Sequence, residues 1–377
     1  MEVKNNYKEC LTNLACSIRK YFGLPTKNNT LEYIDKLLQD YNPKNVIVIL
    51  FDGMGSRILD RTLDENAFFR KNKLKDITSV FPATTTAATT SMRTGLNPIE
   101  HGWLGWNTYI APIDKTITLF LNVEKGKKDI CEEFLKVKDK LVLTTIKHEI
   151  NHNTEYESVE LFPFGENKYN DLDDMINRIL EESKKDGKKY IYAYDDEPDG
   201  TMHEIGNDKE KVIELIKERN LKVYELCEKL EDSVVIVVAD HGHLNVEPIY
   251  IYDYPEICNL LERTTSLEQR AISFKIKEEN KELFEELFEK HFGEYFKLYK
   301  KEEIKESNLF GYGKENELFD EAIGDYIAIA ETSNKCLLSD GDELLKSQHA
   351  GYTDDEIYVP LIIKPTQKKL VKKIDKL

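Results

Sequence analysis

The hydrophobic residues of this chain follow two alternating patterns. Between short apolar runs, apolar residues recur at helical spacing, most clearly over residues 171–185 and 209–230. The runs themselves are rich in β-branched and aromatic residues, as is typical of strands buried on both faces of a sheet. They occupy residues 45–51, 189–194, 233–239 and 358–363. This alternation predicts an α/β fold with a doubly wound, mostly parallel sheet flanked by helices.

Two regions depart from the alternation. Residues 7–40 have helical spacing broken by Gly23 and Pro25, which predicts a helical segment ahead of the first strand. Residues 255–345 contain shorter and more charged elements, including the strand-like stretches AISFKI and DYIAIAE. We interpret residues 255–345 as a small α+β cap domain, inserted into a catalytic core formed by residues 1–254 and 346–377.

The charge of the chain limits its partners. It has 70 acidic against 53 basic residues and a formal net charge of -17. The lysine-rich segment 364–376 is typical of a solvated face, so we expect no nucleic acid polymer as a partner. An acidic protein that binds an anionic substrate must reverse the local field, and bound cations are the usual means.

The cysteines and the hydropathy indicate a cellular compartment. Six cysteines are scattered without any Cys-x-x-Cys pair, which argues against a disulfide framework and against a thiolate zinc site. No apolar stretch of about 18 residues and no signal peptide occurs, so no membrane association is expected. We therefore predict a cytoplasmic protein. Its oligomeric state leaves no trace in the sequence.

Acidic and histidine residues cluster where predicted strands end. In open α/β sheets, residues at the carboxyl ends of strands converge on one ligand site. Carboxylates and neutral imidazoles without cysteine suit Zn²⁺ or Mn²⁺ in an open catalytic site. Taken singly, each residue could equally be a turn former, a helix N-cap or a hydrogen-bonded polar residue. The set comprises Asp52, Asp199, His203, Asp240, His241 and His349.

A run of threonines provides a candidate nucleophile. In the segment FPATTTAATT we expect a strand ending at Phe81 and a helix beginning near Thr85. A threonine hydroxyl at a helix N-terminus lies where backbone N–H groups favour an anion. An ordinary N-cap would explain the same pattern, whereas beside a metal ion the hydroxyl becomes a competent nucleophile.

Five motifs, taken in order, carry a family resemblance. DGMG, FPATTTAATTSMRTGLNPIEHG, PDGTMH, ADHGH and QHAGY together resemble the alkaline phosphatase superfamily, most closely its nucleotide pyrophosphatase/phosphodiesterase branch. The resemblance covers residues 45–363, except most of the cap. It implies the alkaline phosphatase-like fold, two divalent metal ions and a threonine nucleophile.

The resemblance also implies a role for each site residue. The nucleophile lies three residues after Pro82 and nine before Thr94, which selects Thr85. A family asparagine that donates to a phosphoryl oxygen is expected at position 106, where this chain has tryptophan, so Asn107 is the candidate equivalent. One ion would be held by Asp52, Thr85, Asp240 and His241, and the other by Asp199, His203 and His349. His243, where the family often has methionine, is expected to be a supporting or structural residue.

This resemblance implies a hydrolase that cleaves phosphodiester or pyrophosphate bonds of a small phosphorylated substrate through a phosphothreonine intermediate. The ions are expected to be Zn²⁺, with Mn²⁺ as the alternative. Hydrolysis of phosphonate C–P bonds or of phosphomonoesters on the same core stays open, as does a metal-binding regulator without turnover. A monoesterase would need an added cation, and Arg93 is expected to pack or lie on the surface instead. Tyr312 and Arg270 are candidate substrate contacts.

Overall fold

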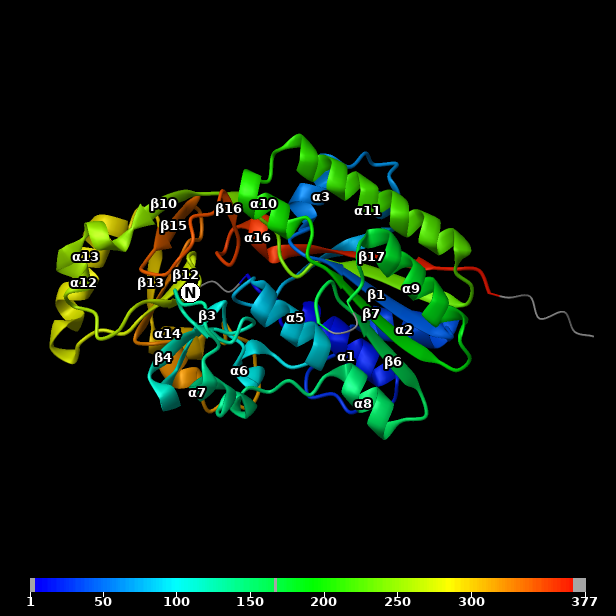
Figure 1. The fold of residues 1–377 in the computed structure, drawn as a ribbon, viewed down its shortest axis with the longest axis horizontal. Coiled ribbons are helices and arrows are strands. Elements are labelled where there is room, and N and C mark those ends of the chain that lie inside the picture. Colours follow the sequence, from blue (N-terminus) through cyan, green and yellow to red (C-terminus); the bar gives the residue numbers. More distant parts are fainter. Residues whose placement is uncertain (1–3, 166–167, 369–377) are drawn as a thin grey trace, which may run out of the picture.

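A six-stranded sheet forms the centre of the molecule. The computed structural model describes residues 4–165 and 168–368. Figure 1 shows the sheet between two groups of helices. Its strand order is β2 (Lys73–Thr78), β17 (Tyr358–Pro365), β8 (Ser233–Val238), β1 (Asn45–Phe51), β7 (Lys189–Asp195) and β6 (Glu157–Leu161).

The sheet is mostly parallel, as predicted. Strand β1 runs parallel to β7 and β8, and β6 runs parallel to β7. Only β17 is antiparallel to its neighbours, β8 and β2. All residues of β1, β7 and β8 are buried because helices cover both faces of the sheet. The predicted α/β fold class is therefore confirmed.

Two layers of helices cover the sheet (Figure 1). The predicted helical segments 171–185 and 209–230 correspond to α9 and α11, and the segment ahead of the first strand to α1 and α2. One layer contains α1 (Leu11–Tyr21), α2 (Glu32–Tyr41), α5 (Thr85–Thr94) and α8 (Ile146–Asn153). The other contains α3 (Ser56–Thr62), α4 (Phe68–Asn72), α9 (Leu172–Lys184) and α11 (Glu210–Lys229).

A second, seven-stranded antiparallel sheet lies beside the first (Figure 1). Its order is β13 (Lys297–Lys300), β14 (Tyr326–Ile329), β12 (Ala271–Phe274), β11 (Ser266–Leu267), β3 (Asn107–Ile110), β4 (Lys115–Thr118) and β5 (Val123–Glu124). Helix α13 (Lys281–Phe292) packs three phenylalanines, at positions 284, 288 and 292, into the core of this half. The sheet thus combines strands from residues 107–124 with strands from 266–329. The division into 1–254 plus 346–377 and 255–345 stays a prediction.

Shorter elements complete the fold. Two-stranded sheets pair β10 (Glu247–Tyr250) with β15 (Lys335–Leu338), and β9 (Leu244–Asn245) with β16 (Ser347–Gln348). The short helices are α6 (Pro98–His101), α7 (Glu132–Leu135), α10 (Asp199–Ile205), α12 (Pro255–Cys258), α14 (Lys301–Glu306), α15 (Phe319–Ala322) and α16 (Asp354–Ile357).

One predicted boundary is wrong. The strand expected to end at Phe81 ends at Thr78, and the backbone N–H of Ser79 then donates to the carbonyl of Ile357, outside the strand ladder. The next helix begins at Thr85, as predicted.

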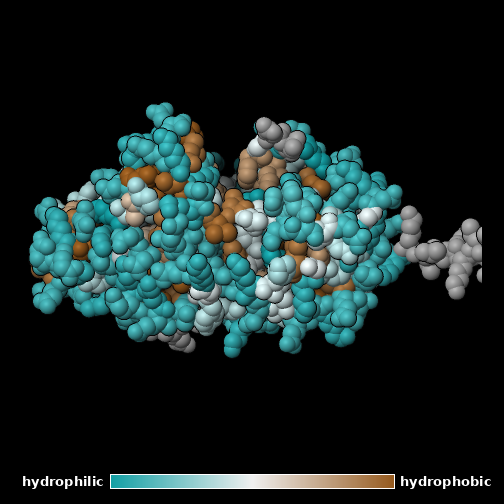
Figure 2. Space-filling view, turned by 90° about the horizontal axis from the view of Figure 1, so that it is seen from below, coloured by the Kyte–Doolittle hydropathy of each residue, from teal (hydrophilic) through white to brown (hydrophobic). Residues whose placement is uncertain are grey.

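The exterior is largely hydrophilic on the face seen in Figure 2. Figure 2 shows one face covered largely by hydrophilic residues, with apolar residues gathered near its middle, between two raised parts. No helix in residues 4–165 and 168–368 is long and apolar enough to span a membrane. Most of the lysine-rich segment 364–376 lies outside the described residues.

Candidate metal centre

The first group of predicted ligands surrounds the Thr85 hydroxyl. Asp52 directly follows β1, and Asp240 and His241 follow β8. Because β1 and β8 are parallel neighbours, their carboxyl ends lie side by side. Thr85 Oγ1 lies 3.1 Å from His241 Nε2 and 3.3 Å from Asp52 Oδ2. Asp240 Oδ2 lies 3.6 Å from the same imidazole nitrogen.

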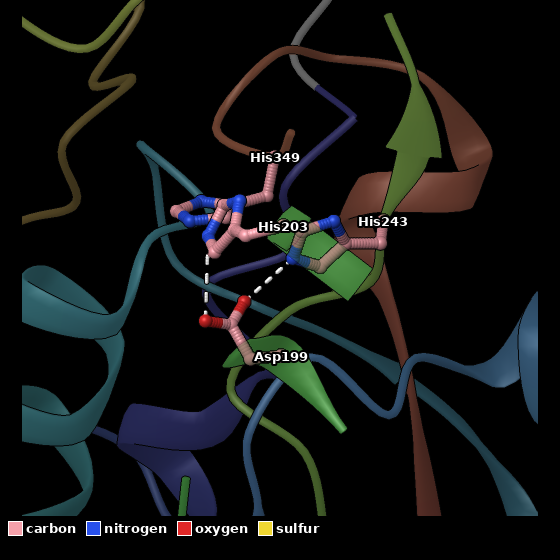
Figure 3. Close-up of side chains that lie close together, drawn as sticks. All are labelled: Asp199, His203, His243 and His349. Atoms are coloured by element: carbon pink, nitrogen blue, oxygen red, sulfur yellow. Dashed lines mark hydrogen bonds and ion pairs between the residues drawn. The ribbon is translucent and has the colours of Figure 1, made fainter. Parts of the chain in front are cut away.

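The second group comes from α10 and from the loop after β16, as Figure 3 shows. Asp199 and His203 are four residues apart on one helical face, and His203 Nε2 lies 3.3 Å from Asp199 Oδ2. His349 joins them, and its ring centroid lies 5.4 Å from that of His203. His243 Nε2 contacts Asp199 Oδ1 at 2.5 Å. Ligand atoms of all four residues lie within 4.8 Å of one another.

The two groups are continuous. Asp199 also belongs to a cluster with Asp52 and His241, whose ligand atoms lie within 4.8 Å of one another. The rings of His241 and His349 stack at 3.8 Å between centroids. The structure therefore gathers all six predicted Asp and His residues and Thr85 into one region.

Hydrogen bonds orient the three predicted imidazole ligands in the same way. His203 Nδ1 lies 2.8 Å from the Ser347 carbonyl, His241 Nδ1 3.1 Å from the Gly242 carbonyl and His349 Nδ1 3.1 Å from the Ala83 carbonyl. A carbonyl oxygen only accepts, so each Nδ1 carries the proton. In its neutral form each ring would therefore present an Nε2 lone pair, the form that binds a metal ion.

The carboxylates carry electrostatic strain. Burial, reinforced by the charges of Asp240 and Asp199, raises the pKa of Asp52 well above its usual value. Burial also raises the pKa of Asp240, where Asp199 adds to the effect. The pKa of Asp199 is instead well below its usual value, because His203 and His243 together outweigh the burial that would raise it. Cations placed among these groups would relieve the repulsion.

The donor set fits divalent cations. Asp240 Oδ1 accepts hydrogen bonds from the backbone N–H groups of Gly53 and His241, whereas the buried Oδ2 has no hydrogen-bond partner among the described residues. A buried carboxylate oxygen without a partner is unfavourable unless a cation contacts it. Buried carboxylates and imidazole nitrogens are ligands that Zn²⁺ and Mn²⁺ accept.

The metal centre opens into a cavity of about 620 Å³. Thr85, Asp199, His203 and His349 line one side, and residues of the antiparallel sheet line another. Asn107 is among the latter, and the hydroxyl of Thr118 donates to its Oδ1 at 2.7 Å. The amide Nδ2 of Asn107 is therefore the end left to donate towards a substrate. Trp106, the position expected from the family, lines the same cavity.

Three other candidate residues lie away from the metal centre. Arg93 forms a bidentate ion pair with Glu160, with Nε 2.9 Å from Oε1 and Nη2 3.0 Å from Oε2, and so has a packing role, as expected. Arg270 is fully buried and pairs with Glu356 at 2.7 Å, so the idea that it contacts substrate is wrong. Tyr312 is exposed and does not line the cavity described above.

Two supporting contacts were not anticipated from the sequence. The hydroxyl of Tyr194, on β7, donates to Asp52 Oδ2. Tyr194 faces Leu50 in the parallel register, one position before the strand ends, and this position could have drawn attention to it. Ser347 Oγ lies 2.8 Å from His243 Nδ1. Ser347 and His243 come together only through the pairing of β9 and β16, for which no sequence signal exists.

The α/β fold and this cluster of carboxylate and imidazole groups fit the class of metal-dependent hydrolases. Residues 46–353 match the family described as type I phosphodiesterase / nucleotide pyrophosphatase. The chain belongs to this family, and the resemblance noted in the sequence is thereby confirmed. No curated protein matches the chain.

Solved structures agree with this assignment. Murine ectonucleotide pyrophosphatase / phosphodiesterase 5 matches with a TM-score of 0.64 at 21% identity, over 86% of this chain and 90% of that chain. An inactive threonine-to-alanine variant of the murine protein, in complex with AMP, matches with a TM-score of 0.63 at 20% identity over the same shares. The human protein matches with a TM-score of 0.64 at 19% identity, again over 86% and 90%. These matches confirm the fold.

Proposed function

We propose that this protein hydrolyses phosphodiester or pyrophosphate bonds of small phosphorylated substrates, with Thr85 as the nucleophile. The observation that carries the proposal is the position of the Thr85 hydroxyl. It lies at the first residue of α5, within 3.5 Å of both Asp52 oxygens and of His241 Nε2. The dipole and free N–H groups of a helix N-terminus favour the negative charge that an attacking alkoxide and a phosphoryl group bring there.

Two divalent ions fit the site. Asp52, Asp240 and His241, with Thr85, would hold one, and Asp199, His203 and His349 the other. When bound, the ions supply Lewis-acid stabilisation of negative charge on the attacking and leaving oxygens. We propose Zn²⁺, with Mn²⁺ as the alternative, because both accept this donor set.

The residues of the chain perform the remaining steps. The Thr85 oxygen forms a bond to phosphorus while the bond from phosphorus to the leaving oxygen breaks, which gives a phosphothreonine intermediate. Water then attacks phosphorus, the bond to Thr85 breaks, and the threonine is regenerated. Asn107 Nδ2 would donate to a non-bridging oxygen and so stabilise the charge that develops there.

Replacing the nucleophile tests the covalent step. Thr85→Ala should abolish hydrolysis of bis-p-nitrophenyl phosphate while folding stays unchanged and zinc stays bound, because three other proposed ligands remain at that ion. Thr86→Ala is the matched control, because this neighbouring buried hydroxyl has no hydrogen-bond partner among the described residues. Mass spectrometry after an acid quench should find the phosphorus adduct on the peptide containing Thr85. Substantial turnover by Thr85→Ala would refute the covalent step.

The family assignment supports diester or pyrophosphate substrates over the alternatives. Relative rates on bis-p-nitrophenyl phosphate, p-nitrophenyl phosphate and phosphonoacetate separate diesterase, monoesterase and phosphonate hydrolase activities. A regulator without turnover would hydrolyse none of the three. The AMP complex of the murine variant supports a nucleotide-sized substrate, and a cavity of about 620 Å³ is large enough for one. A cytoplasmic location is proposed because all six cysteines are free.

A further inference from the structure

The cavity contains a carboxylate that the proposed chemistry does not use. Glu268 lies in the turn between β11 and β12, where its backbone N–H donates to the Ala271 carbonyl at 3.1 Å. Its side chain lines the same cavity as Thr85, His203 and His349. An acidic group is unexpected in a cavity that must accept a phosphoryl anion.

Several contacts fix Glu268 in this position. The backbone N–H of Trp106 donates to Glu268 Oε1 at 2.6 Å. The preceding residue, Leu267, has a φ of 71°, a left-handed conformation that is unfavourable for a bulky side chain. Leu267 pairs with Asn107 across the sheet, and a Cβ on Gly105 would lie only 3.0 Å from the Leu267 Cα. A strained backbone held by close packing suggests that the turn serves the site.

The next residue ties the turn to the metal centre. Gln348 Nε2 donates to Gln269 Oε1 at 2.8 Å, and Gln348 directly precedes the predicted ligand His349. The turn is thus bonded both to the cavity wall at Trp106 and to the loop that supplies a metal ligand.

The carboxyl of Glu268 forms no ion pair with any side chain in the described part of the protein. Among the described residues, no lysine, arginine or histidine nitrogen lies within salt-bridge distance of its carboxyl. Asp342, another acid in the cavity wall, is instead paired with Lys125 at 2.9 Å. Burial, opposed by the Thr84 hydroxyl and the Trp106 N–H, raises the pKa of Glu268 to about 7. Divalent ions in the neighbouring centre would favour its charged form.

We propose that Glu268 makes the enzyme prefer substrates of lower negative charge. Its carboxylate repels a doubly charged phosphomonoester more strongly than a singly charged phosphodiester. This inference rests on the proposed phosphohydrolase function. The phosphoryl group must approach Thr85, and Glu268 lines the same cavity as Thr85, together with Trp106 and Asn107. A monoester brings one more negative charge to this wall than a diester, so the same carboxylate disfavours it more.

Charge-neutralising variants test the proposal. We would measure kcat/KM for p-nitrophenyl phosphate and for bis-p-nitrophenyl phosphate with zinc-loaded wild-type protein and Glu268→Gln. The monoester-to-diester ratio should rise about tenfold or more in Glu268→Gln, because a unit charge in a partly buried site contributes at least that factor. Inorganic phosphate should also become a tighter competitive inhibitor, which a purely structural role would not cause.

Matched variants separate charge from folding. Glu268→Asp keeps the charge and should keep a ratio close to wild type. Glu262→Gln removes an exposed carboxylate outside the cavity and should leave the ratio unchanged. Glu268→Ala repeats the test should the glutamine variant fold poorly.

Two outcomes are distinguishable. An unchanged ratio in Glu268→Gln and Glu268→Ala, with diesterase activity retained, would overturn the role of Glu268. Failure of the wild-type protein to hydrolyse either ester would instead overturn the proposed function.

Discussion

Asp240 offers a test that separates the stability of the site from its function. This residue is fully buried, and its Oδ2 has no hydrogen-bond partner in the described part of the chain. In Asp240→Asn the amide oxygen can still accept from the N–H groups of Gly53 and His241, while its NH₂ can donate to neighbouring Asp52. The substitution therefore removes a buried charge without removing the existing hydrogen bonds.

The expected effect reverses when metal is added. Without metal, Asp240→Asn should be more stable than wild type, with a free energy of unfolding higher by about 1–3 kcal/mol. This is the usual penalty of an unsatisfied buried polar group, which the substitution removes. With free zinc at about 100 times the dissociation constant, the wild-type protein should gain about 2.7 kcal/mol per site from binding. The variant should lose most of that gain at the ion that Asp240 helps to hold. The order of stability of the two proteins should then be opposite in EDTA and in zinc.

Urea unfolding followed by fluorescence gives the free energy of unfolding of both proteins, in EDTA and in buffered zinc. Asp195→Asn is the matched control because Asp195 ends strand β7 of the same sheet but pairs with Arg219 at 2.7 Å. This control should lower stability in both conditions and leave the gain from zinc intact. If Asp240→Asn were less stable than wild type in EDTA, or gained as much from zinc, Asp240 would not be a metal ligand under electrostatic strain.

Two further predictions concern supporting contacts. His243→Ala removes the 2.5 Å contact to Asp199 and should weaken zinc binding about 10- to 100-fold, whereas His243→Gln should restore part of the affinity. Competition with a chelator measures the zinc affinity of both variants. An unchanged affinity would exclude an orienting role for His243. Glu356→Gln, which leaves Arg270 buried without its anion, should lower the free energy of unfolding by about 3–5 kcal/mol at pH 7. Because Arg270 holds the pKa of Glu356 below its usual value despite burial, this difference should shrink as pH falls below about 4.3 through the folded-state pKa; a pH-independent difference in urea midpoints would contradict the ion pair.

The sequence predicts the metal-ligand half of the site because local patterns determine its geometry. Asp52 and Asp240 follow apolar runs that form parallel strands, and parallel strands bring their carboxyl ends to the same edge of a sheet. Asp199 and His203 share a helical face through their spacing alone. These patterns place each pair locally, whereas the grouping of both pairs around two ions was implied only by the family resemblance.

The substrate side of the cavity depends on contacts that no local pattern reveals. Glu268 and Trp106 meet because β11 pairs with β3, across about 160 residues of chain. Leu267 adopts a left-handed conformation that its residue type disfavours, so turn propensity would not predict this turn. Arg270 could not be told from a substrate contact, since its partner Glu356 lies 86 residues further on.

The two sheets give the cavity opposing electrostatic roles. The parallel sheet and the loops that follow it contribute Asp52, Asp199 and Asp240. Two divalent ions would carry one more positive charge than these three carboxylates neutralise. The antiparallel sheet contributes Glu268, which cancels that excess when ionised. Together, these four carboxylates and two divalent ions are neutral, so the ions still attract a phosphoryl oxygen but leave no surplus positive charge for the second negative charge of a monoester. Removing Glu268 should therefore raise monoester hydrolysis relative to diester hydrolysis, whereas removing one of the three proposed ligand aspartates should abolish hydrolysis of both.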